Sequence, residues 1–206
     1  MLIPLTPVRF FEYAEKVFAS KEGVVCEGER FTYGQFCGRV RQMSSALSRI
    51  GVRKGDRVAY LGYNCHRLLE LFYAPVINGA ILEPLNIRLA AKDFEYIINE
   101  STPRLLFLDK DFIPVIQSIR EKIPAVERFI ALERDSGLPG WITGSNEEML
   151  EGASECPAYP LGSYPFEEDD TAEIFYTSGT TGNPKGVSGR ASSRRHRPVD
   201  HAGGTD

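Results

Sequence analysis

The stretch 176–186, which reads YTSGTTGNPKG, concentrates residue types that suit a polyphosphate. It contains three glycines, four serine and threonine hydroxyls and one lysine. Glycines let the backbone adopt left-handed angles and approach a ligand closely, and successive N–H groups in such a turn can converge on an anion. Hydroxyls add donors, Lys185 adds a mobile positive charge, and Pro184 stiffens the loop just before it. The composition therefore predicts a phosphate-binding loop.

Two other interpretations fit this stretch to different degrees. A flexible Gly/Ser/Thr linker stays open, because Tyr176 is the only bulky apolar residue before Val187. A Walker-type loop, G-x-x-x-x-G-K-[ST], does not fit, since Gly186 follows Lys185 where that motif requires serine or threonine.

The elements before the loop determine where it lies in the fold. Ile174, Phe175 and Tyr176 favour a strand, so the loop begins where a strand ends. Upstream, strand patterns alternate with helical patterns, and the strands are expected at residues 57–63, 80–85, 104–108 and 128–132. This alternation predicts an α/β fold with a parallel-rich sheet and helices on both faces. In such folds ligands bind at the carboxyl ends of strands, where this loop lies.

Capping signals locate several of the helices. Thr32 and Gln35 have the spacing of a capping box, and Gly51 is expected to close the helix that follows. Asn64 and Asp111 are expected to cap two later helices. Residues 133–170 are expected to be mostly irregular, with one helical turn at Glu147–Leu150.

YTSGTTGNPKGV resembles the signature loop of the adenylate-forming superfamily, which comprises acyl-CoA synthetases, luciferases and peptide-synthetase adenylation domains. Upstream, GDRVAYLGYN and FYAPVINGAILEPLN resemble the amino-terminal domain of acyl-CoA synthetases. The resemblance implies ATP, Mg²⁺, CoA and a carboxylic acid as ligands, with an acyl-adenylate as intermediate. It also implies an incomplete domain, because the family's adenine contacts, Mg²⁺-binding glutamate and catalytic lid lie downstream.

The resemblance assigns the phosphate contacts to the loop. The implied phosphate-binding residues are Thr177, Ser178, Gly179, Thr180, Thr181, Gly182 and Lys185. Lys185 and Thr181 are the candidate catalytic residues, and the metal ligands are unknown. His66 has no evident partner and is interpreted as structural.

The expected domain division places residues 1–187 in the amino-terminal part of an AMP-binding domain, with its phosphate loop at 176–186. Residues 188–206 form a non-family tail that is expected to be disordered, since it contains four arginines, no lysine and no aromatic residue. Three explanations of this tail stay open. The gene is frameshifted or misjoined, the chain is a short isoform, or the tail is a basic arm that binds RNA or an acidic partner. The chain alone is predicted to be inactive, and a truncated nucleotide-binding or pseudo-enzyme module is the alternative function.

Composition excludes several other classes of protein. A content of 42% hydrophobic and 25% charged residues is typical of a globular protein, and a net charge of −4 argues against general nucleic-acid binding. The four cysteines are far apart, which suits a reducing compartment and predicts a cytoplasmic protein. No signal peptide is predicted, and the most apolar window, 68–87, is too interrupted to span a bilayer.

Overall fold

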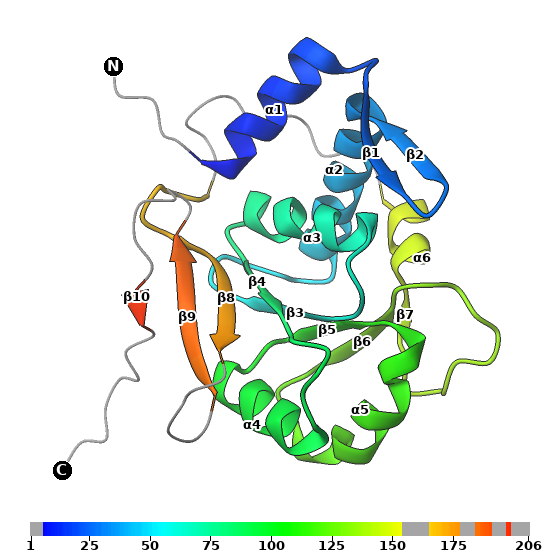
Figure 1. Cartoon of the computed structure of the whole chain (residues 1–206), viewed down its shortest axis with the longest axis vertical. Helices are drawn as coiled ribbons and strands as arrows, with labels where there is room; N and C mark the ends of the chain where they lie inside the picture. The colour runs from blue at the N-terminus through cyan, green and yellow to red at the C-terminus, as the bar shows by residue number, and fades with distance from the viewer. Residues whose placement is uncertain (1–5, 154–164, 178–183, 191–196, 199–206) are drawn as a thin grey trace.

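A computed structural model of the chain describes residues 6–153, 165–177, 184–190 and 197–198 (Figure 1). The helices are α1 (Pro7–Phe18), α2 (Tyr33–Arg49), α3 (His66–Ile77), α4 (Ala91–Ser101), α5 (Ile113–Ile119) and α6 (Asn146–Glu151), with 3₁₀ turns η1 (Lys110–Phe112) and η2 (Arg120–Lys122). The strands are β1 (Glu22–Cys26), β2 (Glu29–Thr32), β3 (Arg57–Leu61), β4 (Ile81–Pro84), β5 (Leu105–Leu108), β6 (Arg128–Ala131), β7 (Gly144–Ser145), β8 (Thr171–Thr177), β9 (Lys185–Arg190) and β10 (Arg197–Pro198).

The main sheet is parallel over most of its width. Within the described residues, its strand order is β10-β9-β8-β4-β3-β5-β6-β7. The neighbouring strands β8, β4, β3, β5, β6 and β7 all pair in parallel. At the other edge, β9 pairs antiparallel with β8, and β10 pairs antiparallel with β9. The β1–β2 pair forms a separate antiparallel hairpin. The predicted α/β fold with a parallel-rich sheet is therefore confirmed.

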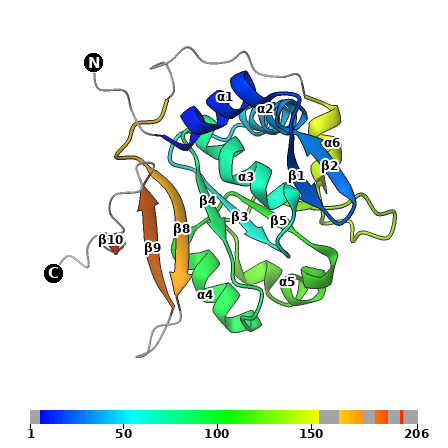
Figure 2. The ribbon, with the colours of Figure 1, turned by 45° about the horizontal axis from the view of Figure 1, so that its top comes forward.

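Helices cover both faces of this sheet because successive strand residues point to opposite sides. On β3, Val58 and Tyr60 join the apolar cluster that contains residues of α2 and α3. Ala59 and Leu61 join a second cluster with residues of α4 and α5. Figures 1 and 2 show α1, α2 and α3 on one side of the sheet and α4 and α5 on the other. Buried strands of this kind lack alternation in sequence because both of their faces lie in the core.

The sequence signals for helix starts were right in one case and wrong in two. Thr32 accepts a hydrogen bond from the Gln35 backbone N–H, and the Gln35 side chain accepts one from the Thr32 N–H, so the capping box is confirmed. Asn64 does not cap α3, because Cys65 is the N-cap residue and no side chain caps this helix. Asp111 does not cap either, since the preceding Asp109 accepts a hydrogen bond from its N–H at the start of η1.

Replacing Thr32 with alanine removes one partner of the capping box. We expect the free energy of unfolding to fall by about 1 kcal/mol, because the Gln35 N–H at the start of α2 loses its acceptor. Chemical denaturation of the purified chain measures this change. Thr32→Ser keeps the acceptor and should stay close to wild type; an equal loss in both variants would contradict a capping role.

Ion pairs join α6 to the helices α2 and α3. Arg39 on α2 donates hydrogen bonds to Glu70 at 2.5 Å and to Glu147 at 3.0 Å. Arg67 on α3 donates a second hydrogen bond to Glu147 at 3.3 Å. The side chain of Glu70 is fully buried, with 0% of its surface exposed, so its charge depends on Arg39. These contacts hold the long connection after β6 against the helical layer.

Residues 188–190 continue strand β9, although no regular structure was expected after Val187. Ser188 pairs with Ile174, and Gly189 pairs with Glu173. Backbone pairing of this kind requires no hydrophobic periodicity in the strand itself, so the sequence pattern carried no sign of it. The division of the chain at residue 187 and the nature of the tail stay predictions. Among the described helices, none has the length and apolar character needed to cross a membrane.

Candidate functional site: the carboxyl edge of the sheet

The ends of the predicted phosphate loop meet at the carboxyl end of β8. Thr177 is the last residue of β8, Lys185 is the first residue of β9, and the two are cross-strand partners. The structure therefore brings these two predicted phosphate-binding residues together. The other predicted residues, Ser178, Gly179, Thr180, Thr181 and Gly182, lie outside the described residues.

Lys185 supplies an uncompensated positive charge at this edge. Its side chain is exposed, and in the described part of the chain it forms no ion pair. The exposed Thr177 beside it offers a hydroxyl donor. A mobile ammonium group and a hydroxyl at the mouth of a glycine-rich turn can hold the oxygens of a phosphate chain.

Tyr176 and Gly186 form the cross-strand pair next to this position. Gly186 is buried, and a Cβ atom added there would lie 3.2 Å from Tyr176 Cζ. The tyrosine ring therefore covers the glycine backbone, and a larger residue at 186 would force it to shift. We define Tyr176, Thr177, Lys185 and Gly186 as the loop neck. The structure therefore gives Gly186 a packing role.

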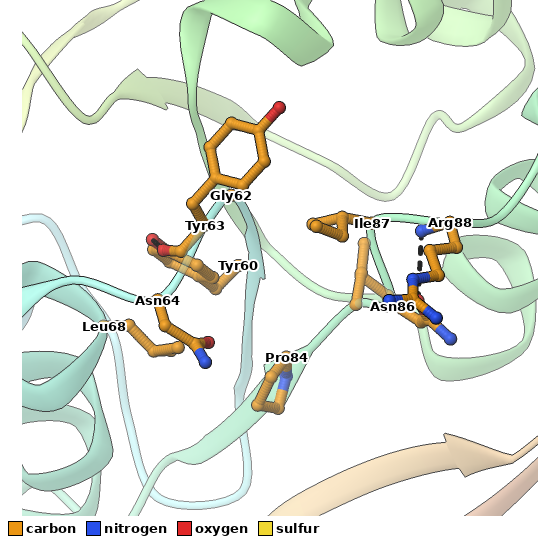
Figure 3. A pocket seen from close by; sticks show the side chains of 10 residues that line it. Tyr60, Gly62, Tyr63, Asn64, Leu68, Pro84, Asn86, Ile87 and Arg88 are labelled. Atoms are coloured by element: carbon orange, nitrogen blue, oxygen red, sulfur yellow. Dashed lines mark hydrogen bonds between the residues drawn. The ribbon is translucent and has the colours of Figure 1, made fainter.

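A cavity of about 420 Å³ lies at the carboxyl ends of β3 and β4 (Figure 3). Asn64 faces it from the segment after β3, and Asn86 and Arg88 face it from the segment after β4. The buried Tyr60 forms part of its wall and donates a hydrogen bond from its hydroxyl to the Tyr63 carbonyl at 2.6 Å, which fixes the turn after β3. Sequence reasoning missed this cavity, although both segments follow predicted strand ends.

The cavity and the loop neck lie at the same edge of the sheet, because β3, β4 and β8 are parallel and adjacent. The exposed guanidinium of Arg88 and the amides of Asn64 and Asn86 can form hydrogen bonds with a polar or anionic ligand. This edge therefore offers cationic groups on two neighbouring segments of the chain, Lys185 and Arg88.

The described residues do not provide a metal site. No group of three or more histidine, cysteine or acidic side chains in the described ranges is arranged to hold a metal ion. His66 is buried against the Phe31 ring, with ring centroids 5.1 Å apart, and lies at the start of α3. Burial, Arg67 and Arg39 lower the pKa of His66 to about 4, so it is neutral at physiological pH. These surroundings favour the structural interpretation of His66.

The parallel-rich sheet with these features at its strand ends defines an α/β protein of the class that binds ligands at the carboxyl edge. Comparison with known families is more specific. Residues 11–192 match the AMP-binding enzyme family, and the chain belongs to that family. The match extends past Val187.

Curated relatives are CoA ligases that are much longer than this chain. The chain is 34% identical over 189 residues to 4-hydroxybutyrate–CoA ligase 2 from Metallosphaera sedula, with 89% of this chain and 34% of that protein covered. It is 34% identical over 182 residues to a long-chain-fatty-acid–CoA ligase from Thermus thermophilus, with 86% of this chain and 32% of that protein covered. The chain thus spans about a third of the length of these relatives.

Solved structures agree with this placement. An anthranilate CoA ligase in complex with anthranoyl-AMP superimposes with a TM-score of 0.83 at 24% identity, covering 93% of this chain and 36% of that one, which shows the fold. A Mycobacterium tuberculosis fatty acyl CoA synthetase superimposes with a TM-score of 0.70 at 28% identity, covering 90% of this chain and 34% of that one. The described fold is therefore that of the amino-terminal part of these enzymes.

Proposed function

We propose that this chain is the amino-terminal part of an acyl-CoA synthetase that uses ATP to convert a carboxylic acid, of the fatty-acid type, into an acyl-adenylate. The acyl group is then transferred to CoA. The observation that carries the proposal is the exposed Lys185 paired with Thr177 at the carboxyl end of β8, within a family-matched segment. The names of the relatives, which are ligases for 4-hydroxybutyrate and for long-chain fatty acids, support this substrate class.

In the proposed reaction, the substrate carboxylate attacks the α-phosphate of ATP and pyrophosphate leaves. Lys185 and the Thr177 hydroxyl bind the departing phosphates, with Ser178, Thr180 and Thr181 as further donors. Negative charge grows on these phosphates as the bond breaks, so a fixed donor stabilises the transition state more than bound ATP. Loss of one such donor typically costs about 3–4 kcal/mol.

The metal ion is expected from the family resemblance, whereas the cellular compartment is expected from the cysteines. The resemblance implies Mg²⁺, but the described residues do not form a site for it, and we assign it no step. The described cysteines, Cys26, Cys37 and Cys65, are free thiols, which supports a reducing compartment such as the cytoplasm.

We further propose that the chain binds ATP weakly and does not form acyl-adenylate by itself, because it spans about a third of its CoA-ligase relatives. The alternative function, a nucleotide-binding module without catalysis, is favoured by the same short span. ATP binding by calorimetry, combined with ATP–pyrophosphate exchange in the presence of fatty acids, tests both ideas. We expect measurable ATP binding that Lys185→Ala weakens without abolishing it, and no exchange. Exchange by the pure chain would contradict the proposed inactivity, and absence of ATP binding would contradict the assigned site.

A further inference from the structure

A carboxyl group is buried on β4, the strand that pairs with β8. Glu83 lies on β4, its side chain is 0% exposed, and neither of its oxygens has a hydrogen-bond partner among the described residues. The nearby Ser101 hydroxyl donates its hydrogen bond to the Ile97 carbonyl at 2.8 Å. The Arg57 guanidinium on β3 instead donates to the carbonyls of Ser101, Gly55 and Thr102. A charged carboxylate would be costly in such surroundings.

Burial keeps this carboxyl uncharged at neutral pH. Burial is the main reason that the pKa of Glu83 is raised to about 8; Ser101 and Arg57 lower this pKa, whereas Glu100 on α4 also raises it. Glu83 is therefore mostly protonated at pH 7 and becomes an unpaired buried anion at alkaline pH. No role for this group follows from the proposed reaction.

Tyr176 connects Glu83 to the loop. The phenol packs with the apolar cluster that α4 and α5 form on this face of the sheet, and its ring also lies over Gly186, where an added Cβ atom would be 3.2 Å from Tyr176 Cζ. Burial raises the pKa of Tyr176, and the nearby carboxyls of Glu83 and Glu100 raise it further, whereas a hydrogen bond with Ser101 lowers it. β4 and β8 are adjacent, with Leu82 paired to Glu173, and they lie side by side in Figure 1.

We propose that Tyr176 is a positioning residue for the loop neck, and that Glu83 supports it only while its carboxyl is uncharged. This inference rests on the proposed function of the loop in binding phosphates. The ring fixes the spacing between Thr177 and Lys185 by filling the space over Gly186, which lacks a side chain. When Glu83 ionises, the buried charge must be hydrated, and water can enter only by loosening the packing between β4, β8 and α4.

The proposal predicts local effects that a general loss of stability would not cause. Hydrogen–deuterium exchange of the full chain is measured for the loop neck, with the central strands β5 and β6 as internal reference. In Tyr176→Ala, we expect protection at the neck to fall by about tenfold or more, with little change in β5 and β6. Tyr176→Phe keeps the ring and should retain protection. Tyr176→Leu keeps the apolar volume and serves if the alanine variant does not fold.

The effect of Glu83 ionisation is measured by comparing hydrogen–deuterium exchange of wild type and Glu83→Gln at the same pH values. Above pH 8 the wild-type neck should lose protection, whereas Glu83→Gln cannot ionise and should keep it. Unchanged protection in Tyr176→Ala, an equal loss throughout the sheet, or the same pH dependence in Glu83→Gln would overturn the proposal.

ATP titration of the same variants separates this inference from the proposed function. If wild type binds ATP, Tyr176→Ala should weaken binding by about tenfold while Tyr176→Phe does not, since only the former releases the neck. Equal affinities would overturn the positioning role. If wild type does not bind ATP, the assigned phosphate site is wrong, and the exchange data still decide whether Tyr176 and Glu83 position the neck.

Discussion

Replacing Lys185 with alanine is expected to lower the rate of adenylation by at least about tenfold, which corresponds to about 1.4 kcal/mol of transition-state stabilisation. The test requires a complete enzyme, such as residues 1–187 joined to the downstream part of a CoA-ligase relative. Lys185 stabilises charge that develops on the departing pyrophosphate, so the single-turnover rate should fall more than ATP affinity.

Two matched variants sharpen this experiment. Lys185→Arg keeps the charge but changes its geometry, and it should lose less activity than Lys185→Ala if charge is the main contribution. Thr181→Ala removes one hydroxyl while leaving the backbone of the loop, and it should also lower the single-turnover rate. An unchanged rate in Lys185→Ala, or an effect on ATP binding alone, would show that the loop is a linker or a ground-state binder.

Replacing Arg39 with alanine is expected to lower the free energy of unfolding by about 3–5 kcal/mol, because it leaves the buried Glu70 carboxylate without its partner. Burial raises the pKa of Glu70 even though Arg39 lowers it, so the carboxylate is held charged at a cost. Arg39 also donates to Glu147, and its loss should loosen α6. Chemical denaturation measures the loss, and limited proteolysis of the segment after β6 measures the loosening.

The chain offers a matched control on its surface. Arg30 and Glu22 form an ion pair at 2.8 Å, but their side chains are 62% and 49% exposed. Arg30→Ala should therefore cost no more than about 1 kcal/mol. The double variant Arg39→Met/Glu70→Leu removes both charges and should recover much of the stability lost in Arg39→Ala. Similar losses in Arg39→Ala and Arg30→Ala would contradict the role assigned to burial.

The sequence by itself determined the elements and their approximate order. Apolar runs such as RLLFL and RFIAL predicted strands, and the structure places them as the inner strands β5 and β6 of the sheet. The capping box at Thr32 was equally readable, because its hydrogen bonds join residues three positions apart. The phosphate loop at 176–186 is predicted from residue types alone, and the structure places its two ends in β8 and β9. All of these signals are local, so a contiguous stretch of sequence contains them.

Only the tertiary structure decided which distant residues meet. Arg39 and Glu147 are separated by 108 positions and hydrogen-bond through the packing of three helices, which no local pattern predicts. The cavity arises because parallel strands end together, and the buried Glu83 carboxyl has no hydrogen-bond partner among the described residues. Asparagine is a common helix-capping residue, which led to the prediction at Asn64, but Cys65 is the N-cap residue of α3. Burial and pairing depend on what the folded chain places around a residue, and the sequence reveals only the residue itself.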